Sequence, residues 1–260
     1  MSRIFTLASG SSGNCTFIGC GKNGILVDAG ISAKSITEGL ESVAFDPKNL
    51  SAIFITHEHI DHINGLRVFS KKYNIPIFAS VKTLASICCA TQIEESLINP
   101  FDGSVEVDGM KITRFATSHD CEGSSGYAIN LPDGKKCAVC TDLGVVTNEV
   151  RNAILGSDAI VFESNHDVNM LQKGTYPEHL KKRILSDHGH LSNNACSIEL
   201  PKLVESGTTR IILAHLSREN NLPAIAESSA KAALMDKGMV AGDDYILYIA
   251  PPKSGKSMMF

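Results

Sequence analysis

One short run of residues, Thr56-His57-Glu58-His59-Ile60-Asp61-His62, limits what this chain can fold into more than any other segment. It follows an apolar stretch that is typical of a buried strand, and it gathers four potential metal ligands. In an extended chain, residues two apart project to the same side, so His57 and His59 can share one metal ion. Asp61 and His62, at the turn into the next helix, can reach a second ion. Imidazole suits zinc, iron or nickel, and an added carboxylate suits a hydrolytic site.

Two other interpretations of this run are less favoured. A zincin helix needs a second histidine four positions after His57, but that position holds Asp61. A surface loop that is rich in histidine by chance is the alternative without function. The 260 residues contain only 9 histidines, so such a cluster beside an aspartate would be unusual. We therefore predict a metal site.

Short apolar runs and turn residues predict that strands dominate both halves of the chain, with helices inserted between them. The expected strands and hairpin arms are 4–7, 16–18, 24–27, 52–55, 75–78, 104–117 with a turn at Asp108-Gly109, 126–131, 136–141, 159–162, 210–213, 245–250 and 257–260. The expected helices are 32–43 with Ser32 as the cap, 65–72, 81–89, 177–185, 193–206 and 222–237. Two sheets packed face to face with helices outside would fit this α/β pattern, as a single domain over residues 1–260.

The metal-ligand run resembles the signature of the metallo-β-lactamase superfamily, and four further segments match that family in the same order. They are Leu26-Val27-Asp28-Ala29-Gly30, Thr117-Ser118-His119-Asp120, Cys140-Thr141-Asp142-Leu143-Gly144 and Leu213-Ala214-His215-Leu216-Ser217. The resemblance covers nearly the whole chain. It implies the αβ/βα four-layer sandwich of that family, in which two mixed β-sheets are flanked by helices.

The resemblance also implies a centre for two divalent ions, which would be zinc, manganese or iron. Asp61 is expected to act in catalysis as well as in metal binding. Asp28 would orient a ligand histidine by contacting the ring nitrogen that does not bind the metal. Two ions about 3.5–4 Å apart can polarise an ester and hold a bridging hydroxide as the nucleophile. The implied ligands are His57, His59 and His119 for the first ion, Asp61, His62 and His215 for the second, and Asp142 as the bridge between them.

The aspartate at position 142 is similar to the glyoxalase, nuclease and phosphodiesterase branches, whereas the antibiotic-hydrolysing enzymes generally carry a cysteine there. The segments 9–14, 163–167, 187–193 and 215–221 look like the bacterial YycJ or WalJ (VicX) branch, which is associated with cell-wall regulatory operons and regarded as nuclease-like. Glu163 and His190 resemble, in order, two elements of transfer-RNA 3′-processing nucleases. His190 would therefore act as a general acid or phosphate ligand.

Six residues are candidates for contact with a substrate phosphate. Ser192 begins a helix, and helix N-termini attract phosphate. Each candidate also has a structural alternative, as part of a turn or a helix cap. For His166 the structural and functional interpretations are balanced, and for His179 we find no functional case. The six candidates are Ser11, Ser12, Asn14, His188, His190 and Ser192.

The net charge of −4 argues for modest, local contact with nucleic acid. The basic run Lys181-Lys182-Arg183 is most simply a solvated helix face, although it lies just before His190 and could supply such a contact. No export signal or membrane-length apolar run is found, so we expect a cytoplasmic protein that is not bound to membranes. Two patterns are expected to carry no function. Cys137 and Cys140 read as core residues, and 250–257 matches a phosphate loop only by chance, because no helix can follow it.

The sequence therefore predicts a dinuclear metal-dependent hydrolase, a phosphodiesterase or exonuclease that acts on DNA or RNA, with DNA and strand ends favoured. No flavin or nucleotide cofactor is expected, and the oligomeric state stays open. One alternative is a hydrolase of small (thio)esters or cyclic phosphates. Another is a regulator of a cell-wall two-component system that acts by binding signalling proteins. A di-iron redox enzyme is less favoured, because no segment is left over for its flavin domain.

Overall fold

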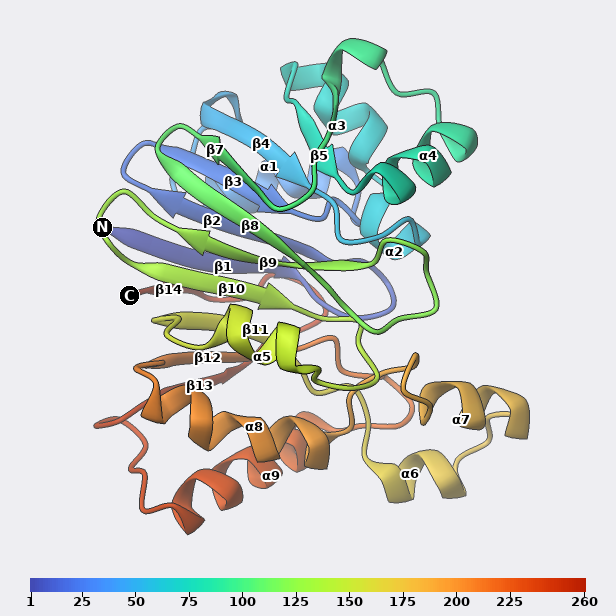
Figure 1. Cartoon of the computed structure of the whole chain (residues 1–260), viewed down its shortest axis with the longest axis vertical. Coiled ribbons are helices and arrows are strands. Elements are labelled where there is room, and N and C mark those ends of the chain that lie inside the picture. Colours follow the sequence, from blue (N-terminus) through green and yellow to red (C-terminus); the bar gives the residue numbers. More distant parts are fainter.

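Two seven-stranded β-sheets lie face to face at the centre of the molecule in the computed structural model, which describes residues 1–260 (Figure 1). The first sheet has the order β14-β1-β2-β3-β4-β5-β6, with β1 (Ser2–Ala8), β2 (Cys15–Cys20), β3 (Asn23–Val27), β4 (Leu50–Phe54), β5 (Ile77–Ala79), β6 (Ile98–Pro100) and β14 (Ser257–Met259). The second has the order β13-β12-β11-β10-β9-β8-β7, with β7 (Ser104–Val107), β8 (Met110–Ala116), β9 (Ser125–Asn130), β10 (Lys136–Cys140), β11 (Ala159–Glu163), β12 (Arg210–Ala214) and β13 (Ile246–Ile249).

Both sheets are mixed, and they follow the same plan. In the first sheet the neighbours from β14 to β3 are antiparallel, whereas β3, β4, β5 and β6 are parallel. In the second sheet the neighbours from β7 to β10 are antiparallel, whereas β10, β11, β12 and β13 are parallel. Parallel strands need crossover connections, which are usually helices, so each sheet acquires a helical layer.

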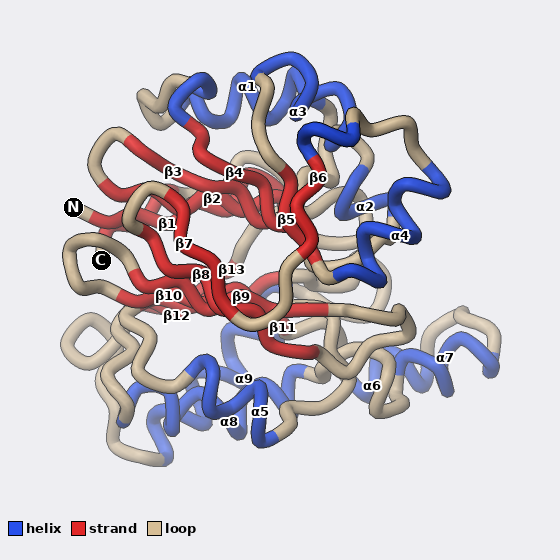
Figure 2. The backbone as a smooth tube through the Cα atoms, turned by 45° about the horizontal axis from the view of Figure 1, so that its top comes forward, coloured by secondary structure: helices blue, strands red, loops and turns tan.

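Helices cover the outer faces of the two sheets and complete four layers (Figure 2). The first sheet is flanked by α1 (Ala33–Ser42), α2 (Ile60–Ile63), α3 (Leu66–Tyr73) and α4 (Val81–Ala90). The second is flanked by α5 (Asn148–Ile154), α8 (Asn193–Glu205) and α9 (Pro223–Asp236), while α6 (Val168–Lys173) and α7 (Glu178–Ile184) lie at one end. Short 3₁₀ turns occupy Pro47–Asn49 and Glu95–Leu97. The predicted four-layer sandwich is confirmed, and no helix has the length and apolar character that crossing a membrane requires.

The core is divided by the sheets into three layers of apolar side chains. Successive residues of a strand face opposite sides, so Ile4 of β1 packs between the sheets, whereas Phe5 and Leu7 pack under the helices. All three are at most 3% exposed, and burial of such a side chain contributes roughly 1.5–3 kcal/mol. Cys137 and Cys140 are buried in β10 on opposite faces, as the prediction of core cysteines requires.

Several local predictions are confirmed by the structure. Ser32 caps α1 by accepting a hydrogen bond from the backbone N–H of Ser35. The hairpin of β7 and β8 turns at Asp108 and Gly109, as predicted. Both residues have positive φ, which is typical of tight turns whose backbone twist matches that of the flanking strands. Ser257 begins β14 instead of a helix, so the segment 250–257 is not a phosphate loop.

Candidate metal centre

The residues of the predicted metal centre lie at the carboxyl ends of strands from both sheets, at the end of the sandwich opposite the chain termini (Figure 1). Ligands of α/β sheets are typically bound at this edge, because the loops that leave the strands converge there. The residues that follow β3, β4, β8, β10 and β12 within three positions are Asp28, His57, His119, Asp142 and His215, respectively.

The first group of side chains brings together His57, His59 and His119. Nε2 of His57 lies 3.0 Å from Nδ1 of His59, and the ring of His119 lies 5.0 Å from that of His57 between centroids. Potential ligand atoms of these three residues and of Cys121 all lie within 4.8 Å of one another. One ion can therefore be reached by all three imidazoles.

The second group contains Asp61, His62 and His215, whose potential ligand atoms also lie within 4.8 Å of one another. Asp61 and His62 belong to the one-turn helix α2, and the Asp61 carboxylate lies 3.5 Å from Nε2 of His62 and 3.8 Å from Nε2 of His215. The side-chain amide of Asn14 contacts this group, at 3.2 Å from the Asp61 carboxylate and 3.0 Å from Nε2 of His62.

The carboxylate of Asp142 stands between the two groups. Its Oδ2 lies 3.4 Å from Nε2 of His62, and its Oδ1 lies 3.9 Å from Nε2 of His119. Asp142 is 2% exposed and has a positive φ of 58°. Asp28 and His215 share this left-handed conformation, which costs a residue other than glycine roughly 1–3 kcal/mol and is concentrated at functional sites.

Each histidine of the two groups contacts, through one ring nitrogen, a residue outside the seven predicted ligands. Such partners fix the orientation and tautomer of metal-binding imidazoles. The partners are the Thr56 hydroxyl for His57 at 3.0 Å, Cys121 Sγ for His59 at 3.1 Å, the Asp28 carboxylate for His62 at 2.8 Å, the Gly189 carbonyl for His119 at 3.1 Å and the Glu163 carboxylate for His215 at 2.8 Å.

Three buried polar atoms of the cluster have no hydrogen-bond partner, namely Nε2 of His119, Oδ2 of Asp142 and Nε2 of His215. Leaving such an atom unsatisfied costs roughly 1–3 kcal/mol, so their convergence needs a compensating ligand. Imidazole nitrogens and carboxylate oxygens together suit zinc and other divalent transition metals. The donor set of this structure therefore fits divalent metal ions.

The electrostatics of the cluster also favour a cation. Burial opposes the charged form of His62, but the carboxylates of Asp28, Asp142 and Asp61 outweigh it and raise the pKa of this imidazole to about 9. Burial, reinforced by neighbouring imidazoles, lowers the pKa of His57 well below its usual range, which keeps this side chain in the neutral form that binds metals. Metal ions can replace the protons that imidazoles and carboxylates would otherwise share.

Glu163 links the metal centre to His190. Its Oε1 lies 2.9 Å from Nδ1 of His190 and 2.8 Å from Nδ1 of His215. Burial alone would raise the pKa of Glu163, but the charge of His190 and hydrogen bonds from both histidines lower it well below its usual range. The ring of His190 is partly exposed, 5.1 Å from that of His119, so it can meet a molecule bound at the centre.

The other phosphate candidates are more dispersed. Asn14 is buried against the second group of ligands, while Ser11 and Ser12 are exposed on the loop before it. His188 is exposed, 3.4 Å from the Ser118 hydroxyl, and the Ser192 hydroxyl caps α8. Outside this set, His166 is buried without a partner and His179 is exposed on α7.

Two features of the site were not predicted from the sequence. Cys121 contacts His59 at the first group, and its only sequence signal is its place two residues after His119. Asp120 lies 3.2 Å from Nε2 of His119 and forms an ion pair with Arg183 of the basic run. Arg183 is thereby held at the rim of the centre, whereas the Lys181 amine contacts Glu178 and the Gln172 carbonyl.

Comparison with known proteins identifies the family. Residues 23–216 match the model of the beta-lactamase superfamily domain. The exodeoxyribonuclease YycJ of Bacillus anthracis is 37% identical over 257 residues, covering 95% of this chain and 94% of YycJ. The exodeoxyribonuclease WalJ of Streptococcus pneumoniae is 36% identical over 251 residues, covering 95% of this chain and 93% of WalJ. The crystal structure of zinc-bound PqqB from Methylobacterium extorquens is similar in fold, with a TM-score of 0.73 at 17% identity and 100% of both chains covered. The chain therefore belongs to the metallo-β-lactamase superfamily, in its YycJ/WalJ branch, as its motifs predicted.

Proposed function

We propose that this protein is a metal-dependent exodeoxyribonuclease with a centre for two divalent ions. The observation that carries the proposal is the position of Asp142 between two groups of ligand atoms, where its own Oδ2 and Nε2 of His119 and His215 are buried without partners. The names of the two similar relatives support DNA as the substrate.

We assign the ligands by the two groups that the fold brings together. His57, His59 and His119 would hold the first ion, and Asp61, His62 and His215 the second. Asp142 would be shared, because its carboxylate faces both groups. Zinc, manganese and iron all suit this donor set, and zinc is the metal named for PqqB.

The bound ions would supply neutralisation of the scissile phosphate and activation of a water molecule as the nucleophile. The residues of the chain would orient the reacting groups. Asp28 holds the ring of His62, and Glu163 holds that of His215, so neither imidazole can rotate away from the cluster. Their fixed positions would keep the ions where a phosphate can be held in line for attack.

We assign His190 as the proton donor to the leaving oxygen. Its Nδ1 is engaged by Glu163, so Nε2 is the ring nitrogen available to the substrate. Glu163 holds the ring in place, and a proton on Nε2 would be donated to the departing strand end. Asn14 donates hydrogen bonds from its amide to the Asp61 carboxylate and the Gly10 carbonyl, so it would hold Asp61 in position.

The experiment is a substrate panel with the protein loaded with zinc, manganese or iron. End-labelled single-stranded DNA, RNA of the same sequence, bis-p-nitrophenyl phosphate and S-lactoylglutathione are offered in parallel, and metal content is measured on each sample. We expect stepwise shortening of DNA from one end, and loss of this activity in Asp142→Asn. Turnover of the thioester alone would overturn the proposal.

A further inference from the structure

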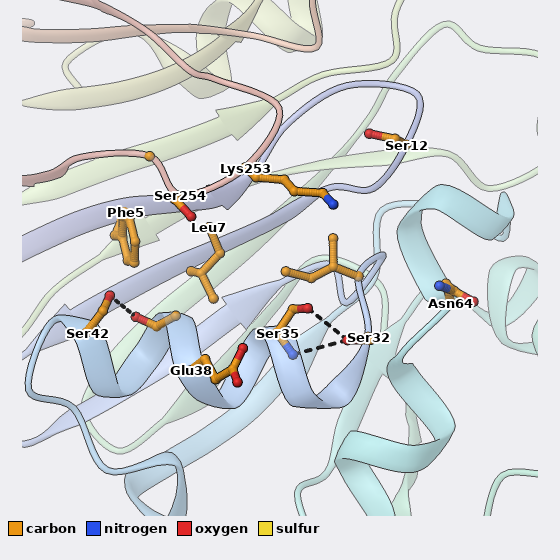
Figure 3. A pocket seen from close by; sticks show the side chains of 13 residues that line it. Phe5, Leu7, Ser12, Ser32, Ser35, Glu38, Ser42, Asn64, Lys253 and Ser254 are labelled. Carbon is orange, nitrogen blue, oxygen red and sulfur yellow. Dashed lines mark hydrogen bonds between the residues drawn. The ribbon is translucent and has the colours of Figure 1, made fainter.

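A cavity of about 590 Å³ lies between β1 and α1 and is not used by the chemistry described above (Figure 3). Its walls come from β1, α1, the loop that connects β1 to β2, and the loop that precedes β14. Five serine hydroxyls line it, from Ser12, Ser32, Ser35, Ser42 and Ser254. A pocket of this polarity and volume is suited to a small polar ligand or to a part of a polymer.

The cavity adjoins the metal centre, because three of its lining residues belong to segments that carry site residues. Ser12 is two residues before Asn14, which contacts the second group of ligands. Asn64 is two residues after His62, and Ile31 is three residues after Asp28. Two or three residues of chain span at most about 11 Å, so this part of the cavity wall lies close to the segments that carry the site residues.

Backbone packing holds these segments in fixed positions. Gly30 donates a hydrogen bond to the Asn14 carbonyl across 2.8 Å, and it packs so closely on the Asp61 carbonyl that any side chain would overlap it. Gly65 donates to the Ala29 carbonyl, also across 2.8 Å. The wall of the cavity and the metal-binding loop are thus one packed unit, which is the preorganisation that a binding subsite needs.

Positive charge is placed on the Ser12 side of the cavity. The ammonium group of Lys253 points into the cavity, on the side of Ser12 (Figure 3). Arg218, three residues after His215, donates a hydrogen bond from Nη2 to the Ser12 hydroxyl across 2.7 Å. An anion at Ser12 would therefore meet two cations and a hydroxyl donor.

The rest of the cavity has a different character. Glu38 lines it from α1 and lies 3.7 Å from Lys34, so phosphate is disfavoured at that end. Phe5, Leu7 and Ile31 provide an apolar floor that suits the face of a sugar or a base. The polar and apolar parts thus match a nucleotide that has its phosphate at Ser12 and its base deeper inside.

We propose that this cavity binds the nucleotides of a single DNA strand that adjoin the scissile linkage, with Lys253 and Ser12 on the phosphate. The proposal rests on the proposed nuclease function and adds to it a subsite for the strand. The volume accommodates about one or two nucleotides of an unpaired strand, so the part of the strand inside the cavity must be unpaired.

The test uses the metal-loaded protein and oligothymidylates of increasing length, from two to six nucleotides, as substrates. For the wild type, KM should fall as the second and third nucleotides are added. In Lys253→Gln, KM should decrease much less with increasing length, while kcat should change little. The slope of log(kcat/KM) against log salt concentration should also be smaller in magnitude by about 0.7, the value for one phosphate contact on a single strand.

Lys256→Gln is the matched control, because Lys256 is exposed on the same loop but does not line the cavity. Thermal unfolding of each variant verifies the fold. Equal length dependence in Lys253→Gln and the wild type, or an equal defect in Lys256→Gln, would overturn the subsite while leaving the nuclease function intact. If the wild type cleaves neither DNA nor bis-p-nitrophenyl phosphate with any metal, the proposed function fails, and the subsite fails with it.

Discussion

Oε1 of the buried Glu163 lies 2.9 Å from Nδ1 of His190, although 27 residues separate them in the chain. The same oxygen also contacts His215, so one carboxylate orients a ligand of the metal centre and the residue assigned to protonate the leaving group. The metal centre and the acid are therefore positioned relative to each other by a single side chain. This arrangement predicts that substitution of His190 lowers the cleavage rate more strongly when the leaving oxygen is more basic.

His190→Gln should lower kcat for DNA by about 10²–10⁴-fold, because the departing alkoxide needs a proton. The loss should be much smaller with bis-p-nitrophenyl phosphate, whose nitrophenolate leaves without one. Both rates are measured on samples with equal metal content. His179→Gln, which changes an exposed histidine of α7, should alter neither rate. Equal losses on the two substrates would show that His190 binds phosphate or supports the metals instead.

Asp28→Asn should weaken metal binding at the second group. Asp28 is 2% exposed and holds Nδ1 of His62 at 2.8 Å, and removal of such a partner typically costs 10–100-fold in metal affinity. Competition with a chelator measures the zinc dissociation constants. Asp236→Asn, at the exposed end of α9, is the control with the same chemical change. Unchanged zinc affinity in Asp28→Asn would remove the orienting role assigned to this carboxylate.

Cys121 should act on the first group through His59, since its Sγ lies 3.1 Å from Nε2 while Nδ1 of the same ring faces His57. Cys121→Ala should weaken zinc binding, and Cys121→Ser, which retains a polar partner, should recover most of it. Cys88→Ala, an exposed cysteine of α4, should have no effect. A thiolate-to-cobalt absorption band in the cobalt-substituted wild type that Cys121→Ser abolishes would make this thiol a direct ligand and contradict the assignment.

Much of the metal centre was predictable because its residues sit in local patterns that need no tertiary information. His119, Asp142 and His215 each follow an apolar run, and such runs become the strands whose carboxyl ends converge. Among the residues that hold the ligands in place, Asp28 was predicted from its motif, whereas the others were not predictable in the same way. Glu163 reaches His215 because β11 pairs in parallel with β12 and places Glu163 opposite Ala214, and sequence spacing carries no signal of that register.

The elements that the sequence did not predict are short. α5 and α6 contain 7 and 6 residues, too few for a helical period to be visible. Their ends are fixed by side-chain caps, with Thr147 accepting from the Val150 N–H and Asp167 from the Met170 N–H. Tertiary packing supplies the rest, as in the contact of α5 with α8 through Arg151 and Glu199.

That contact provides a test of the fold that is independent of the metals. The Arg151 guanidinium donates two hydrogen bonds to the Glu199 carboxylate, both at 2.9 Å, and these hydrogen bonds lower the pKa of Glu199 below its usual value. A carboxyl whose pKa is lower in the folded state stabilises the fold above its unfolded pKa, near 4.3 for glutamate, and loses this contribution as the pH falls through its folded value.

Glu199→Gln should therefore reduce the free energy of unfolding at pH 7 by about 1 kcal/mol, and the difference from the wild type should shrink below about pH 4. Urea unfolding in the presence of a chelator measures it at both pH values. Glu205→Gln, exposed at the end of α8, is the control. A deficit that stays constant across this pH range would mean that the ion pair contributes nothing and that the variant acts through packing.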